Sequence, residues 1–69
     1  MWEPKSGEEF FTIKANSDFR FAVSKRVWVE NDFLLEKAFN RGIIFKHQGD
    51  AFELARRLNK LLDNFKRTY

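Results

Sequence analysis

Cysteine is absent from this chain of 69 residues, and His47 is its only histidine. Disulfide bonds and thiolate metal sites are therefore excluded, and a zinc site built from two or three histidines cannot form within one chain. At this length a hydrophobic core seldom contributes more than about 3–5 kcal/mol of net stability. The sequence therefore predicts a single domain over residues 1–69 that depends on dense packing or on a partner subunit.

Long apolar runs are also missing. No segment approaches the roughly 20 apolar residues that span a bilayer, and the opening of the chain has no apolar stretch behind a basic start, as a signal peptide would. We therefore expect a cytoplasmic protein that makes no membrane contact.

Groups of residues that carry catalysis are not visible either. The glycines, Gly7, Gly42 and Gly49, form no phosphate-binding loop, and the aspartates lack the spacing of a calcium loop. For His47, an exposed or capping role is the simpler interpretation. We expect no catalytic residue, no metal, no cofactor and no small-molecule substrate, and hence a protein that is not an enzyme.

Aromatic residues, in contrast, are abundant: they make up 17% of the chain and include nine phenylalanines. Residues 1–8 contain the only proline and predict an extended lead-in that ends in a turn. Residues 9–29 alternate apolar and polar side chains, as strands do, and the small polar residues 15–18 predict a hairpin turn. We expect a turn or bulge at residues 24–25 and a further strand after it, because one uninterrupted strand reaching Val29 would exceed the usual length.

The second half of the chain has helical spacing. Asn31 or Asp32 can cap a short helix over residues 32–41, and residues 43–45 predict a short strand. Residues 49–67 predict a long amphipathic helix, because apolar residues recur there every three or four positions. This apolar stripe consists of Ala51, Leu54, Ala55, Leu58, Leu61, Leu62 and Phe65.

Together these elements predict an α+β fold. We expect a small antiparallel β-sheet of about three strands, with room for a short fourth, packed against one long C-terminal amphipathic helix and accompanied by a short middle helix. The sheet face directed at the long helix would carry Phe11, Ile13, Phe19, Phe21, Val23, Val27 and Val29. The outer face would carry Phe10, Thr12, Lys14, Arg20, Arg26 and Trp28.

That outer face suits more than one partner. Basic and aromatic side chains on a sheet, here Arg20, Arg26 and Trp28, can hold phosphates and stack bases. The same types of residue are enriched in homodimer and partner interfaces. In a third arrangement, Trp2 or the short helix folds over this face. We expect burial by the chain itself or by a second subunit rather than base stacking, because so short a chain has little other core.

Positive charge is concentrated in the later part of the chain. The net charge is +3, with six Lys/Arg and seven Asp/Glu in residues 1–40 but seven and three in residues 41–69. Arg56, Arg57 and Lys60 on the long helix could neutralise the phosphates of a nucleic acid. A solvated helix face is the simpler interpretation, because acidic residues interrupt the basic patch.

Two segments resemble a group of known proteins. Residues 2–11 have the pattern W-x-P-x-x-G-E-x-F-F, and a G-x-x-F segment at residues 42–45 precedes a helix that begins with Asp50 and Ala51. This combination resembles small uncharacterised proteins encoded by phages and prophages of bacteria. The resemblance implies an accessory protein of a phage or mobile element that acts in the cytoplasm of the bacterial host cell. Proteins of that kind often regulate phage DNA or inhibit host systems, as anti-CRISPR proteins do.

The sequence leaves two functions open. The first is a non-enzymatic protein that binds nucleic acid, or a complex that handles nucleic acid, through a basic and aromatic surface. Its expected binding residues are Arg20, Arg26, Trp28, Arg56, Arg57 and Lys60. The second is a homodimeric protein-interaction module that inhibits a host factor or a defence system. Burial of Phe10 and Trp28 between subunits would exclude base stacking on that face.

Overall fold

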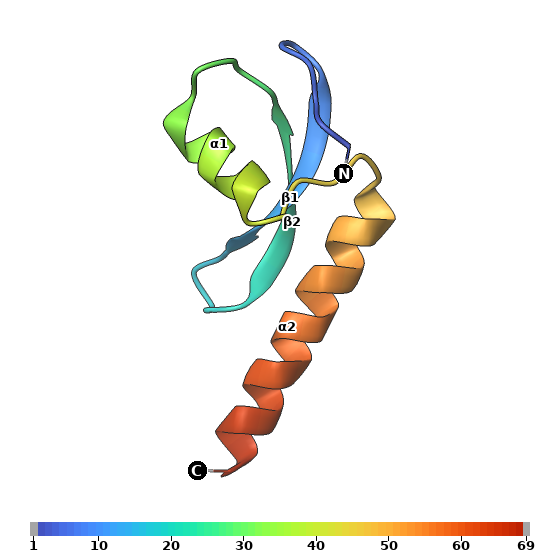
Figure 1. The fold of residues 1–69 in the computed structure, drawn as a ribbon. Coiled ribbons are helices and arrows are strands. Elements are labelled where there is room, and N and C mark those ends of the chain that lie inside the picture. The colour runs from blue at the N-terminus through green and yellow to red at the C-terminus, as the bar shows by residue number, and fades with distance from the viewer. Residues whose placement is uncertain (1, 69) are drawn as a thin grey trace.

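The computed structural model describes the backbone of residues 2–68 and the side chains of residues 2–65. The chain forms an α+β fold with the element order β1 (Glu9–Ala15), β2 (Phe21–Val27), α1 (Phe33–Asn40) and α2 (Gln48–Thr68). Figure 1 shows the two strands between the two helices, with α2 extending well beyond the end of the sheet. The predicted fold class and both predicted helices are confirmed, whereas the sheet has only two strands.

The hairpin follows the predicted turn but begins its second strand later. β1 and β2 are antiparallel, in a register that runs from Glu9 opposite Val27 to Ala15 opposite Phe21. In the turn, the side chain of Asn16 accepts hydrogen bonds from two backbone N–H groups, and Phe19 has a φ of 59°. This left-handed conformation prevents Phe19 from joining the strand. Phe19 is 87% exposed, so its predicted place in the core is wrong.

The turn or bulge expected at residues 24–25 is absent. Ser24 lies opposite Thr12 and Lys25 lies opposite Phe11, so the ladder continues without interruption to Val27. The strand is only seven residues long, because the hairpin turn delays its start. Of the further strand that we expected after this turn, residues 26–27 belong to β2, whereas residues 28–29 are not in a strand.

The strand predicted at residues 43–45 is reduced to a single bridge. Phe11 and Phe45 exchange two backbone hydrogen bonds, each 2.8 Å long, on the side of β1 away from β2. Ile44 before the bridge is buried, and a bend follows Phe45 and leads directly into α2. The segment between the helices therefore pairs with the backbone of β1 at one residue only, while the side chain of Thr12 in β1 donates a hydrogen bond to the C=O of Ile43, at 2.6 Å.

The main core lies between the sheet and α1. Asp32 caps this helix by accepting hydrogen bonds from the backbone N–H groups of Leu34 and Leu35. The core cluster contains Phe10, Trp28, Leu35 and Ile44, with Trp2, Ala38 and Phe39 packed against it.

Phe10 and Trp28 lie on the sheet face opposite α2, as predicted, but this face is not on the outside. Phe10 is fully buried and Trp28 is 7% exposed, because α1 packs over them. Their rings meet edge to face, with centroids 5.9 Å apart, and Phe39 of α1 contacts Trp28 in the same way. The third arrangement above, in which the chain folds over its own sheet, is the one observed.

The second helix covers the opposite face of the sheet. Ala51 and Ala55 are buried there, and these small side chains let α2 approach the strands closely. Phe11, Ile13, Phe21 and Val23 are half-buried, whereas the predicted burial of Val27 and Val29 is wrong. Within residues 2–68, no helix combines the length and the apolar character needed to cross a membrane.

Candidate functional site

Of the three sheet residues predicted to bind a partner, only the two arginines are accessible. Trp28 lies in the core, so its ring cannot stack on a base while the fold is intact. Arg26 is exposed near the end of β2. Arg20, just before β2, reaches α2 and donates two hydrogen bonds to the carboxylate of Asp63, at 3.0 and 3.4 Å.

One carboxylate, that of Glu53, also accompanies Arg56 and Arg57 of the long helix. Arg56 donates two hydrogen bonds to Glu53, at 2.7 and 3.1 Å, and Arg57 donates one at 3.0 Å. These hydrogen bonds, first from Arg56 and then from Arg57, lower the pKa of Glu53 to about 2. The bond to Asp63 in turn raises the pKa of Arg20. Three of the six predicted binding residues therefore already have an anionic partner within the chain.

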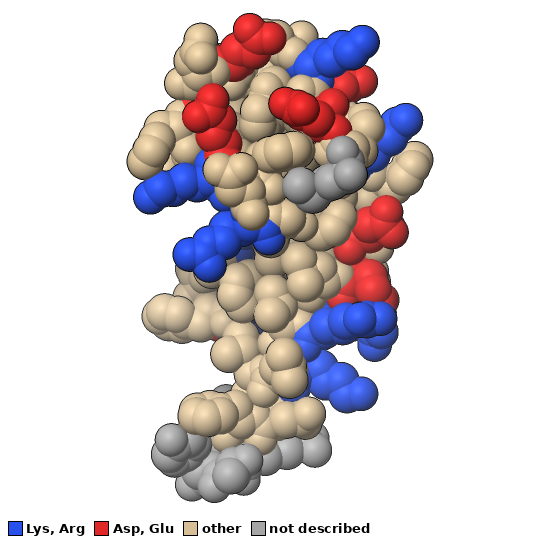
Figure 2. Space-filling view, viewed as in Figure 1, with Lys and Arg blue, Asp and Glu red and all other residues tan. Residues whose placement is uncertain are grey.

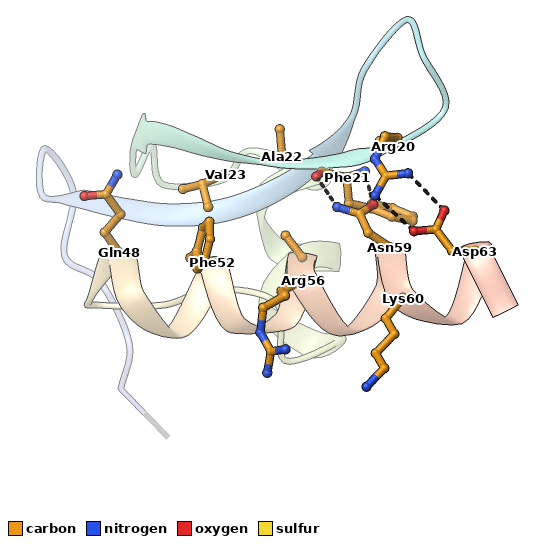
Figure 3. Close-up of a pocket in the computed structure, with 11 residues that line it drawn as sticks. Arg20, Phe21, Ala22, Val23, Gln48, Phe52, Arg56, Asn59, Lys60 and Asp63 are labelled. Carbon is orange, nitrogen blue, oxygen red and sulfur yellow. Dashed lines mark hydrogen bonds and ion pairs between the residues drawn. The ribbon is translucent and has the colours of Figure 1, made fainter.

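A groove between β2 and α2 brings three of the predicted residues together. It has a volume of about 530 Å³ and is lined by Arg20, Arg56 and Lys60 together with apolar side chains, among them Val23 and Phe52. In Figure 3, Phe52 points from α2 toward Val23, while Arg56 and Lys60 point away from the sheet. Lys60 makes no ion pair among the described residues. Arg26, Trp28 and Arg57 do not line this groove.

The groove is also lined by Asn59, which our sequence analysis did not single out. Its side-chain amide accepts a hydrogen bond from the N–H of Phe21, at 2.7 Å, and donates one to the C=O of Phe21, at 3.0 Å. The only signal in the sequence is its spacing. Asn59 follows the buried Ala51 and Ala55 at four-residue intervals, which places it on the same helix face.

Apolar side chains are exposed where α2 extends past the sheet. Leu61 is 63% exposed and Leu62 is 43% exposed. The exposed ring of Phe19 belongs to the same end of the molecule, because its neighbour Arg20 is bonded to Asp63 of α2. We call Phe19, Leu61 and Leu62 the end patch. In Figure 2 the surface around this part of α2 is mostly tan, the colour of residues without charge, and blue Lys and Arg side chains lie along one side of it.

Within the described residues, no three His, Cys, Asp or Glu side chains are grouped so that they could hold a metal ion. No family model matches the chain, and no curated protein or solved structure matches it significantly.

Proposed function

We propose that this protein is a protein-interaction module that pairs with a second copy of itself through the end patch. The observation that supports this proposal is the exposure of Leu61 and Leu62 on the same apolar stripe whose earlier residues, Leu54 and Leu58, are half-buried beside the sheet. Removing apolar surface from water contributes roughly 25 cal/mol per Å². Two leucines and a phenylalanine at one end of so small a molecule therefore favour association.

A second copy suits this patch because the chain has few other sources of stability. Its buried hydrophobic residues number only six among those described, and it has no cysteine with which to form a disulfide. Small domains of this kind are commonly stabilised by oligomerisation. In a two-fold dimer the same patch is covered on both copies, so a single set of side chains suffices for the whole interface.

Nucleic-acid binding has less support from the geometry. The aromatic ring expected to stack on bases is buried, and Arg20, Arg56 and Arg57 are bound to carboxylates. These pairs are exposed and weak, so the buried ring of Trp28 is the main observation against base stacking. Titration of labelled DNA and RNA at two salt concentrations distinguishes the functions: the dimer module shows no binding that weakens with salt, whereas a nucleic-acid binder does.

The experiment that tests the dimer is light scattering during size-exclusion chromatography. We expect the wild-type mass to be twice that of one chain and to fall to one chain in Leu61→Asp. The matched control is Leu34→Asp, since Leu34 is similarly exposed but lies on α1; this variant should remain dimeric. A wild-type protein that is monomeric at submillimolar concentration, or a dimer insensitive to Leu61→Asp, overturns the proposal.

We also propose, from the resemblance of residues 2–11 and 42–51 to phage-encoded proteins, that the module is an accessory protein that acts on a host factor in the bacterial cytoplasm. The genes next to its coding sequence test this point. Neighbouring recombination, lysis or anti-defence genes support it, and a stable chromosomal context of unrelated metabolic genes opposes it.

A further inference from the structure

The outer edge of β2 has unused hydrogen-bonding groups. In an antiparallel pair, successive residues direct their N–H and C=O groups alternately toward and away from the partner strand. Phe11 uses these groups to bond Phe45, so Lys25, which lies opposite Phe11, directs its own groups away from β1. Phe21 does the same, as its bonds to Asn59 show. Val23 lies between these two residues in β2, so its N–H and C=O groups also point away from β1.

Asn59 already acts on this edge as a neighbouring strand would. Its amide supplies one acceptor and one donor to a single residue of β2, the same pair of bonds that an added strand makes. Beyond Phe21, no group among residues 2–65 bonds the outward N–H and C=O of Val23 or Lys25. The edge of β2 is therefore occupied by Asn59 at Phe21 and open at Val23 and Lys25.

We propose that this open edge, together with the adjoining groove along α2, binds an extended segment of a partner protein by adding it to the sheet as a further strand. Addition of a strand to an exposed sheet edge is a common mode of peptide recognition, in which backbone bonds give affinity and side-chain pockets give specificity. The pocket here is formed by Val23 and by Phe52, whose ring is 60% exposed beside the edge.

The charges beside the edge define the chemistry of the partner segment. Val23 and Lys25 are two positions apart and point to the same side of the sheet, the side of α2. The added strand therefore places an apolar residue against Val23 and Phe52. Two positions further along it places an acidic residue against Lys25. The ion pair between Lys25 and Glu9 does not prevent this, because both side chains are more than half exposed and such pairs are weak.

A second copy of the same strand is a less suitable occupant of this edge. Pairing two copies of β2 about Lys25 would place two lysines directly opposite each other, which is destabilising. Pairing about Val23 would require the edge groups of Phe21, which Asn59 occupies. Pairing about Ser24 uses only the open groups of Val23 and Lys25, but it sets Val23 opposite Lys25 and offers neither lysine an acidic partner. The β2 edge and the end patch are therefore separate surfaces, and an experiment can disprove the proposal for one without disproving the proposal for the other.

The test is selection of a displayed library of random eight-residue peptides against the full chain. We expect enrichment of peptides that carry an apolar and an acidic residue two positions apart. Synthetic versions of an enriched peptide are then N-methylated at alternate amides. One set of N-methyl groups should weaken binding at least tenfold and the other set should not, because only alternate amides of an added strand face β2.

Two variants and their controls place the peptide on the molecule. Phe52→Asp should weaken binding at least tenfold, whereas Phe33→Asp, on the exposed side of α1, should not. Lys25→Pro removes one outward N–H, a change that edge strands tolerate, and it should have the same effect as Phe52→Asp. Leu61→Asp should leave peptide binding intact even where it abolishes the dimer.

Three results overturn the proposal. They are a library that yields no enriched peptide, peptides whose affinity is insensitive to both sets of N-methyl groups, and binding that survives Phe52→Asp but is lost in Leu61→Asp. The N-methylated peptides need no change in the protein, so they test strand addition even if Lys25→Pro does not fold.

Discussion

Asn59 of α2 holds Phe21 of β2 by both of its backbone groups, with bonds of 2.7 and 3.0 Å. The two residues are 38 positions apart, and the contact fixes the long helix along the edge of the hairpin. A side-chain amide is well suited to this task because it carries one acceptor and two donors. The bidentate contact between Arg20 and Asp63 lies one turn further along α2 and strengthens the same attachment.

Replacement of Asn59 should therefore destabilise the protein. Asn59→Ala leaves the edge groups of Phe21 without their partners in a half-buried place, and we expect a loss of about 1–3 kcal/mol in the free energy of unfolding. Asn59→Asp keeps an acceptor for the N–H but sets a carboxylate beside the carbonyl, so it should also destabilise. Urea unfolding measures both, with exposed Asn40→Ala as a control that should change little. Equal stability of Asn59→Ala and wild type would show that the contact does not hold the helix.

Both helices were predictable because their signals are local. Seven apolar residues at helical spacing define α2, and the cap of α1 requires only Asp32 and the two N–H groups that follow it. The burial of the second sheet face was harder to predict. Alternation correctly directed Phe11 and Ile13 toward the long helix. It left open whether the chain itself or a second subunit covers Phe10 on the opposite face, where Leu35 of α1 packs.

The core between the sheet and α1 should be sensitive to small losses of volume. Phe10 is fully buried against Trp28, so Phe10→Ala should cost about 3–5 kcal/mol, which equals the whole net stability expected for a chain of this size. We expect this variant to be unfolded and Phe10→Leu to be folded but weaker. Thermal unfolding followed by circular dichroism tests both. Phe33→Ala is the matched control, because that ring is largely exposed on α1.

The ion pairs of α2 should make stability depend on pH in the acid range. The pKa of Glu53 is lowered from 4.5 to about 2 by Arg56 and Arg57, so the folded state favours the charged carboxylate. Its contribution is complete above the unfolded pKa and disappears as the pH falls through the folded one. The stability difference between wild type and Glu53→Gln should therefore be present at pH 7 and shrink between about pH 4.5 and pH 2.

An NMR titration of the Glu53 side-chain carbonyl checks this directly, with an expected midpoint near 2. Because both arginine side chains are largely exposed, added salt should raise that midpoint and reduce the stability difference. A midpoint at the ordinary value of glutamate would show that the pairs do not persist in solution.

The candidate surfaces were less predictable than the fold because they depend on distant pairs. Arg20 and Asp63 are 43 positions apart, and no local pattern indicates that one neutralises the other. The grouping of Arg56 and Arg57 on Glu53 is different, since its spacing of three and four residues is visible in the sequence. What the sequence could not indicate is the open edge of β2. The edge is open because the later segment bridges β1 at Phe45 instead of β2, and because Asn59 bonds only Phe21 on β2.

Phe19 offers a test that separates stability from association. Its φ of 59° is costly for a bulky residue, whereas asparagine adopts this conformation readily. Phe19→Asn should therefore raise the free energy of unfolding of the monomer by up to about 1 kcal/mol, measured in the Leu61→Asp background so that dimerisation does not contribute. In the otherwise wild-type chain, the same change removes an exposed ring from the end patch and should weaken the dimer. A stabilised monomer with a weaker dimer supports both assignments of Phe19. If the dimer is unchanged, Phe19 does not belong to the interface, and the patch reduces to the leucines of α2.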